Sequence, residues 1–172
     1  MGQTILVLGA LVLLGVAVLA ANQLMLEKLT ASYDTQATVV AISLAQAEID
    51  EIQRKDYDEH TIARRIYYAS DFTPVDSLGP EAGETSPDLY NDVDDYNEWK
   101  ADNSGYRDSI VVSTPTLDNF VEKCRVEYVS ETDPDSNSST QTFYKRITVT
   151  VTQPSMAYPV VMKALVVYRR YF

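Results

Sequence analysis

An uninterrupted apolar segment near the N-terminus constrains this chain more than any other feature of its sequence. Every residue from 5 to 21 is apolar or glycine, and the first charged side chain is Glu27. As a helix, these 17 residues span about 26 Å, close to the roughly 30 Å of bilayer hydrocarbon. The segment is therefore long enough to cross a membrane.

A cleaved secretory signal peptide is the first alternative for this segment. Ala20 and Ala21 are small enough to serve a signal peptidase, and the apolar run is little longer than the apolar region of a signal peptide. However, no Lys or Arg precedes the run, whereas signal peptides begin with positive charge. We therefore expect a helix that is retained.

The apolar pattern continues well beyond the membrane-length segment. No proline occurs before Pro74 and no glycine occurs between Gly15 and Gly79, so nothing breaks a helix that begins in the apolar run. Apolar residues recur every three or four positions in two adjacent stripes: Leu26, Leu29, Tyr33, Ala37, Val40, Leu44 and Ala47, and Ile42, Ala45, Ile49 and Ile52. This pattern predicts one helix from about residue 3 to about residue 56, on the order of 80 Å long. A small head cannot cover such a helix, so lipid or other chains must bury its first half.

The rest of the chain predicts a head of different composition. Residues 57–70 favour a short second helix, and residues 71–108 form a loop region with eleven Asp and Glu against two basic residues. Four later segments have the alternation that is typical of strands: 110–113, 121–129, 143–152 and 160–170. In the third of them, Ile147, Val149 and Val151 face one way, as in a sheet that a helix covers on one side.

These elements predict an α+β fold, in which the long N-terminal helix packs on a C-terminal antiparallel sheet. We divide the chain into a membrane or filament-core helix at 1–24, its amphipathic continuation at 25–56, and a head at 57–172 with its sheet at 109–172. The formal net charge of −11 argues against nucleic acid as a partner of the head, because such binding needs a basic patch.

Several stretches resemble the type IV pilin and pseudopilin superfamily. They are ATVVAISLAQAEIDEIQRKDYD at 37–58, DLYNDVDDYNEW at 88–99, and the closing segments YKRITVTVTQP at 144–154 and VVMKALVVYRRY at 160–171. The order of long helix, acidic loop and terminal sheet is also similar to that superfamily. The resemblance implies a structural subunit of a type IV pilus-like filament. Such a subunit lies in the inner membrane until an assembly platform and its ATPase move it into an extracellular filament or a periplasmic pseudopilus.

The resemblance also implies a homopolymer that assembles through the apolar helix. The residues we expect in the filament core are Ile5, Leu8, Gly9, Val12, Gly15, Leu19, Leu26 and Leu29. Members of the superfamily carry a glutamate at the fifth mature position, where this chain has Ile5, so we expect a different arrangement at the amino terminus. Two alternatives stay open: a minor pseudopilin of a secretion system, and a single-pass membrane-anchored periplasmic protein that binds a partner.

A run of acidic side chains in the loop region is a candidate calcium site. Asp92, Asp94 and Asp95, with Asn91, Asn97 and Glu98 beside them, supply the hard oxygen ligands that calcium prefers. The run is not an EF-hand, because it lacks the glycine and the final glutamate of that loop. The alternative is a solvated acidic loop that Tyr90, Tyr96 and Trp99 anchor. We expect no other cofactor.

Nothing in the sequence points to catalysis. His60 is the sole histidine and lies in a polar segment without a nucleophile signature, so we expect an exposed or capping histidine rather than a catalytic base. Cys124, the sole cysteine, has the strand parity of Val126 and Tyr128 and is expected to be a small buried residue. We therefore expect a protein that is not an enzyme.

Overall fold

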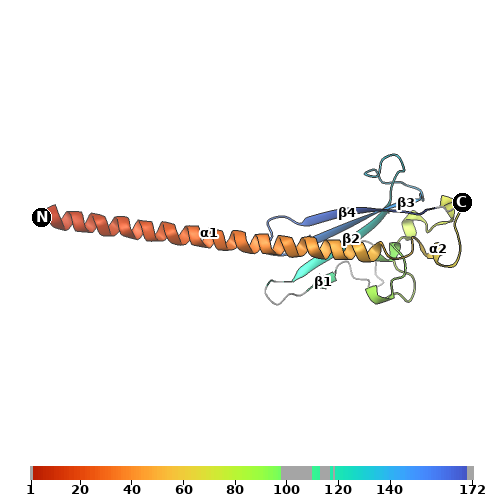
Figure 1. Cartoon of the computed structure of the whole chain (residues 1–172), viewed down its shortest axis with the longest axis horizontal. Coiled ribbons are helices and arrows are strands. Elements are labelled where there is room, and N and C mark those ends of the chain that lie inside the picture. Colours follow the sequence, from red (N-terminus) through yellow and green to blue (C-terminus); the bar gives the residue numbers. More distant parts are fainter. Residues whose placement is uncertain (1, 98–109, 113–116, 118, 170–172) are drawn as a thin grey trace.

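The computed structural model describes residues 2–97, 110–112, 117 and 119–169. The helices are α1 (Gly2–Ile52) and α2 (Glu59–Ala63), and the strands are β1 (Ile110–Val112), β2 (Phe120–Tyr128), β3 (Tyr144–Thr152) and β4 (Val160–Val167). Between them lie four 3₁₀ turns: η1 (Ala69–Asp71), η2 (Val75–Ser77), η3 (Pro87–Leu89) and η4 (Asp94–Tyr96). The head packs against the C-terminal part of α1, so the predicted α+β fold is confirmed (Figure 1).

Some predicted features lie outside the described residues. They are the end of the acidic loop at 98–108, which includes Glu98 and Trp99, and the last residues of two predicted strands, Ser113 and Arg170.

The long helix α1 is one continuous element of 51 residues. At 1.5 Å per residue it is about 77 Å long, as the sequence predicts. It ends at Ile52, a few residues before the predicted boundary, because the chain then tightens into a turn in which Lys55 N–H donates to the Ile52 carbonyl at 3.1 Å. Asp56 leaves the helix direction and pairs with the acidic loop, where Val93 N–H donates to the Asp56 carbonyl at 2.9 Å.

The sheet is an antiparallel meander with the strand order β1-β2-β3-β4. Its register places Cys124 opposite Val149, and Val149 opposite Met162. The predicted strands are confirmed to within a few residues. β4 stops at Val167 because the next residue, Tyr168, turns into an aromatic cluster beyond the end of the sheet, where its ring centroid lies 5.3 Å from that of Phe72.

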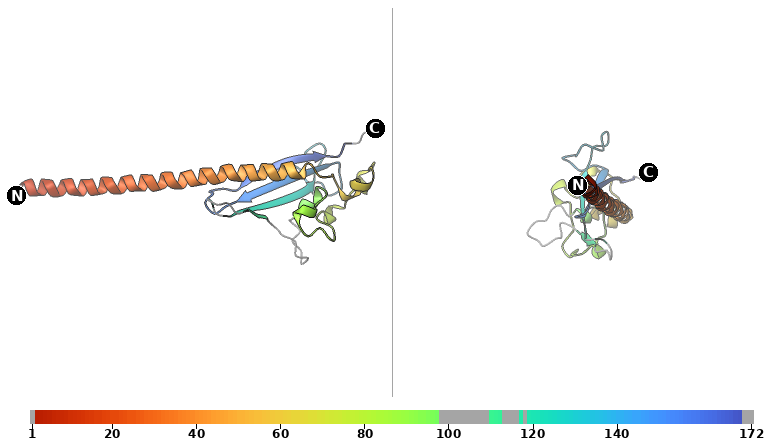
Figure 2. Two further views of the ribbon diagram at one scale, coloured as in Figure 1. Left: turned by 60° about the horizontal axis from the view of Figure 1, so that its bottom comes forward. Right: turned by 90° about the vertical axis from the view of Figure 1, so that its left-hand side faces the viewer.

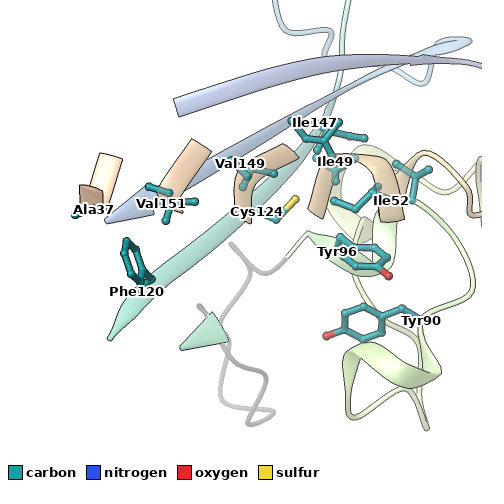
Figure 3. Packing of buried hydrophobic residues seen from close by; sticks show 14 residues of the cluster. Ala37, Ile49, Ile52, Tyr90, Tyr96, Phe120, Cys124, Ile147, Val149 and Val151 are labelled. Atoms are coloured by element: carbon teal, nitrogen blue, oxygen red, sulfur yellow. The ribbon is translucent and has the colours of Figure 1, made fainter. Parts of the chain in front are cut away.

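One face of the sheet packs against α1 and forms the main core. The side chains of α1 that enter this core are Ala37, Ala41, Ala45, Ile49 and Ile52, and we call this set the helix seam. Opposite it, Ile147, Val149 and Val151 of β3 are fully buried, as their alternation predicts, and Cys124 of β2 lies among them (Figure 3). The helix seam combines Ala37 of one predicted stripe with Ala45, Ile49 and Ile52 of the other, and it adds Ala41, which the stripes do not include. Other members of those stripes, Ile42 among them, stay exposed.

A second, aromatic core lies beyond the C-terminal end of α1. Tyr57, Phe72 and Tyr128 are buried in it, together with Ile66 and Leu78. The ring centroids of Tyr57 and Phe72 are 4.9 Å apart. The segment 57–70 is α-helical only in α2, because Arg64 is already extended and the chain then turns Ile66 into this core.

The N-terminal half of α1 extends away from the head. The left view of Figure 2 shows the same separation, with the helix continuing far past the strands and no other described segment beside its N-terminal half. Among the described residues, the hydrogen bond between head and helix nearest to the N-terminus runs from Ala157 N–H to Asp34 Oδ1, at 2.8 Å. Ala37 is the first residue of α1 that is buried.

Candidate functional site

The uncovered half of α1 is the first candidate site, and we call residues 5–29 the apolar rod. The six large side chains predicted for a filament core are all 50–70% exposed there: Ile5, Leu8, Val12, Leu19, Leu26 and Leu29. Apart from the backbone of the helix itself, nothing lies within 4 Å of the place where a Cβ of Gly9 or Gly15 would stand. All eight predicted assembly residues thus lie on one uncovered helix.

The length and composition of α1 are those of a membrane-crossing helix. Its most hydrophobic stretch has a mean hydropathy of 2.8 and is 0% buried by the rest of the chain. The first charged residues, Glu27 and Lys28, follow the stretch that is long enough to cross a bilayer. Membrane insertion through α1 is therefore physically possible.

Of the three aspartates predicted as calcium ligands, Asp94 and Asp95 lie in η4 and Asp92 lies two residues before it, and all three are buried. Tyr96, in the same turn, packs edge to face on Tyr90 with the ring centroids 5.0 Å apart. The two tyrosines therefore anchor the loop as predicted, but a solvated loop does not describe the carboxylates of Asp92, Asp94 and Asp95.

Asp94 is held by a lysine rather than by its neighbours in the sequence. The ammonium of Lys145, fully buried on β3, lies 2.5 Å from Asp94 Oδ1 and 3.0 Å from Asp58 Oδ2. Its third donor contact is to the Tyr57 carbonyl at 2.8 Å. Burial acts to raise the pKa of Asp58, but Lys145 and two backbone N–H donors outweigh this effect and hold the pKa below its ordinary value. For Asp94, burial dominates and raises the pKa, with Lys145 opposing it.

The side chains of Asp92 and Asp95 stabilise the backbone of the turn around η4 through hydrogen bonds. The N–H groups of Asp94 and Asp95 donate to Asp92 Oδ1, at 2.8 and 3.2 Å. In return, Asp95 Oδ2 accepts from the N–H groups of Asn91 and Asp92, at 2.8 and 3.0 Å. One oxygen of each carboxylate is therefore committed to the backbone, and the other is left for a different partner.

The carboxylates of Asp92 and Asp95 lie close to three glutamates from other segments. Carboxylate oxygens of Glu59, Glu81 and Asp92 lie within 4.8 Å of one another, as do those of Glu81, Glu84 and Asp95. We call these five residues the carboxylate cluster. Burial and the neighbouring Asp94 and Asp95 raise the pKa of Asp92 to about 10. Burial and the neighbouring Glu84 and Asp95 raise the pKa of Glu81 to about 9.

The sequence pointed to Asp92 and Asp95 but missed the three glutamates. Glu59 is the first residue of α2, after the N-cap Asp58. Acidic residues are common in the first turn of a helix because they interact favourably with the helix dipole, so Glu59 gave no sign of a metal site. Glu81 and Glu84 flank a turn in which Glu84 N–H donates to the Glu81 carbonyl at 3.1 Å. The sequence offers one signal for them: Glu81 and Glu84 are three residues apart, as are Asp92 and Asp95. This shared spacing could have indicated that the two pairs lie together.

The two residues considered for catalysis have structural roles. His60 is exposed, its N–H donates to Asp58 Oδ1 at 3.1 Å in the cap of α2, and its Nδ1 lies 3.1 Å from the same oxygen. Cys124 is buried in the main core, as its parity predicts.

The candidate sites are thus an uncovered apolar helix and a buried set of carboxylates on opposite parts of one chain. The first is suited to association with lipid or with other helices, and the second is suited to a hard cation. No protein-family model, curated protein or solved structure matches the chain.

Proposed function

We propose that this chain is a structural subunit of a type IV pilus-like filament and polymerises through the apolar rod. One observation supports this function: beyond the segment that a bilayer would cover, α1 still has apolar side chains that the head leaves exposed. A membrane accounts for residues 5–21, which span about 26 Å as a helix. It does not account for the apolar residues beyond Glu27 and Lys28.

Large apolar side chains beyond this point stay exposed on α1. Leu29, Tyr33, Val39 and Ile42 are 46–58% exposed. A single-pass anchor would leave them in water, whereas the α1 helices of neighbouring copies would cover them in a bundle. Side chains of this size gain roughly 1.5–3 kcal/mol each when they are fully removed from water. The exposed flank therefore favours a polymer over a lone anchor.

The route into the filament follows from the same surface. Before assembly, the apolar rod lies in the inner membrane, where lipid covers it as well as another helix would. Moving it from lipid into a helix bundle gains little free energy, so we expect an assembly platform and an ATPase to drive the step. The acidic heads then form the outside of the extracellular filament or periplasmic pseudopilus. This role involves no catalytic step.

The test is a charge placed on the exposed flank outside the membrane segment. Val39→Lys puts an ammonium where a neighbouring helix would pack, yet it leaves both the apolar rod and the helix seam unchanged. We expect Val39→Lys to be inserted in the membrane at the normal level and to abolish filaments in electron micrographs of sheared cell surfaces. Gln53→Lys, also exposed but beyond the end of α1, is the matched control and should assemble normally.

Labelling with an antibody against the head separates the remaining alternatives. Continuous labelling along filaments supports a major subunit, and labelling at the tips alone supports a minor pseudopilin. If cells carrying the unaltered chain make no labelled filament, the chain is a membrane-anchored binding protein and the proposal is wrong.

A further inference from the structure

The carboxylate cluster joins three segments that are far apart in the sequence. Glu59 comes from the start of α2, Glu81 and Glu84 come from the turn after η2, and Asp92 and Asp95 come from η4 and the residues before it. Gly83, with a φ of +115°, lets this turn bring Glu81 and Glu84 to the same side. Glu81 belongs to both groups of converging oxygens, so the cluster is centred on it.

Three shielded oxygens of this cluster, one each on Asp92, Asp95 and Glu59, lack a donor among the described residues. Asp92 and Asp95 are both 0% exposed. Asp92 Oδ2, Asp95 Oδ1 and Glu59 Oε2 are shielded from solvent and accept no hydrogen bond from the described part of the chain. A buried carboxylate oxygen without a partner is costly, which is why such atoms in folded proteins usually contact a donor or a metal.

The nearest buried cation does not balance this charge. Lys145 donates its three ammonium hydrogens to Tyr57, Asp58 and Asp94, and none remains for the carboxylate cluster. The Lys55 ammonium donates to the Tyr90 carbonyl at 2.7 Å. These two ammonium groups are therefore engaged by partners outside the carboxylate cluster.

We propose that the carboxylate cluster binds one calcium ion, with Glu59, Glu81 and Asp92 as ligands and with Glu84 and Asp95 completing the site. Calcium accepts six to eight oxygen ligands at about 2.3–2.6 Å, so opposite ligands in its shell stand about 4.6–5.2 Å apart. The separations of up to 4.8 Å within each group suit such a shell. Magnesium requires oxygens at about 2.0–2.1 Å and a stricter octahedron, so it fits this arrangement less well.

The ligand set differs from the one that the sequence predicts. Asp94 is committed to Lys145, and Asn97 is committed to the backbone because its Oδ1 accepts from Val126 N–H at 3.1 Å. The calcium ion instead links α2, the Glu81 turn and η4. Binding therefore fastens the acidic loop onto the end of α1, where Asp56 pairs with Asp92.

The test is calorimetry on the full chain in detergent micelles, after dialysis against a chelator. Titration with calcium chloride should give saturable binding of one ion per chain and a higher midpoint of thermal unfolding, and magnesium should bind at least tenfold more weakly. Glu81→Gln should weaken calcium binding at least tenfold. Asp88→Asn, exposed in the same loop, is the matched control and should bind as the unaltered chain does.

Unfolding midpoints separate a calcium ligand from a residue that only supports the fold. In chelator, Glu81→Gln should unfold at the same temperature as the unaltered chain or at a higher one, because the amide matches the size of the carboxyl group and adds no charge to the cluster. In calcium, it should unfold at a lower temperature. Glu59→Gln, on the more accessible α2, should show the same crossover. The proposal is overturned by an absence of saturable binding below about 5 mM calcium, at the weak end for extracellular calcium modules. Equal weakening by Asp88→Asn would also overturn it.

Discussion

Lys145 connects parts of the head that are distant in the sequence. Its ammonium lies between the carboxylates of Asp58 and Asp94, and it stands 4.5 Å from the ring centroid of Tyr57 and 5.1 Å from that of Tyr128. The Tyr128 hydroxyl lies 3.1 Å from Asp58 Oδ2, so it supports the same carboxylate. A buried ion pair of this kind contributes little net free energy over an apolar substitute, but the loss of one partner is expensive.

Replacing this lysine should therefore destabilise the head strongly. Lys145→Met keeps the length of the side chain but leaves Asp58 and Asp94 buried without their cation. We expect a loss of about 3–5 kcal/mol in the free energy of unfolding, measured by urea denaturation in detergent with near-ultraviolet circular dichroism. Lys163→Met is the control, because Lys163 is exposed on β4 and lies 3.5 Å from an exposed Asp135. Equal losses for the two variants would contradict this role of Lys145.

Glu48 should make the stability of the head depend on pH. It lies on α1, and burial, followed by the nearby Glu122 and Glu51, raises its pKa to about 7. The folded state therefore holds the Glu48 proton more tightly than the unfolded state, whose pKa is near the ordinary 4.5. The resulting stabilisation is present below pH 4.5 and is lost as the pH rises through 7.

Glu48→Gln removes this loss. At pH 8 the variant should be more stable than the unaltered chain by about 1–2 kcal/mol, less than the full pKa difference would give because Glu48 is partly exposed to solvent. At pH 4.5 the two should differ little. Urea denaturation at both pH values measures the effect, and a difference that does not change with pH would refute this prediction.

At the scale of elements, the helix seam sets how closely α1 approaches the sheet. Ala37, Ala41 and Ala45 follow one another at intervals of four residues and are fully buried against the sheet. Their small side chains let the helix backbone lie close to the strands. Larger residues at these positions have no space, because the opposing Val149 and Val151 are also fully buried.

Enlarging one residue of the helix seam should strain the packing of α1. Ala41→Leu is expected to cost about 1–3 kcal/mol in the free energy of unfolding, because overpacking a dense core displaces its neighbours. Ala47→Leu makes the same change on the exposed side of α1, and its effect should stay within about 0.5 kcal/mol. Thermal unfolding of both variants in detergent measures the difference. If Ala41→Leu lowers the stability no more than Ala47→Leu does, the packing of α1 on the sheet is loose and this prediction is wrong.

The elements themselves could be predicted because their patterns are local. The spacing of apolar residues predicts α1, and the alternation of Ile147, Val149 and Val151 predicts β3 and its buried face. The sequence does not show which of the two apolar stripes of α1 meets the sheet, because alanine is only weakly apolar and its fit depends on the opposite surface. The pairing of Asp94 with Lys145 could not be predicted either. It spans 51 residues and depends on how η4 is placed against the sheet.

At the scale of the whole molecule, the apolar rod and the head are separate in their contacts. The head first reaches α1 at Asp34, through Ala157, and its core begins at Ala37. Residues before this point contribute no buried side chain to the head among the described residues. Only the part of α1 after residue 33 therefore contributes to the stability of the head. The apolar rod determines whether the chain is soluble in water or needs lipid, detergent or other copies around it.

Truncations on either side of this boundary should consequently behave differently. Removing residues 2–28 is expected to give a soluble monomer in detergent-free buffer, with the same unfolding midpoint as the head of the full chain in micelles. Removing residues 2–44 also deletes Ala37 and Ala41 from the helix seam and exposes Val151 and Phe120 of the sheet, so it should cost about 3 kcal/mol or more. Analytical ultracentrifugation gives the oligomeric state, and circular dichroism gives the midpoints. If the chain without residues 2–28 unfolds or aggregates, the apolar rod must pack against its own head. Other copies of the chain would then not be needed to cover the rod.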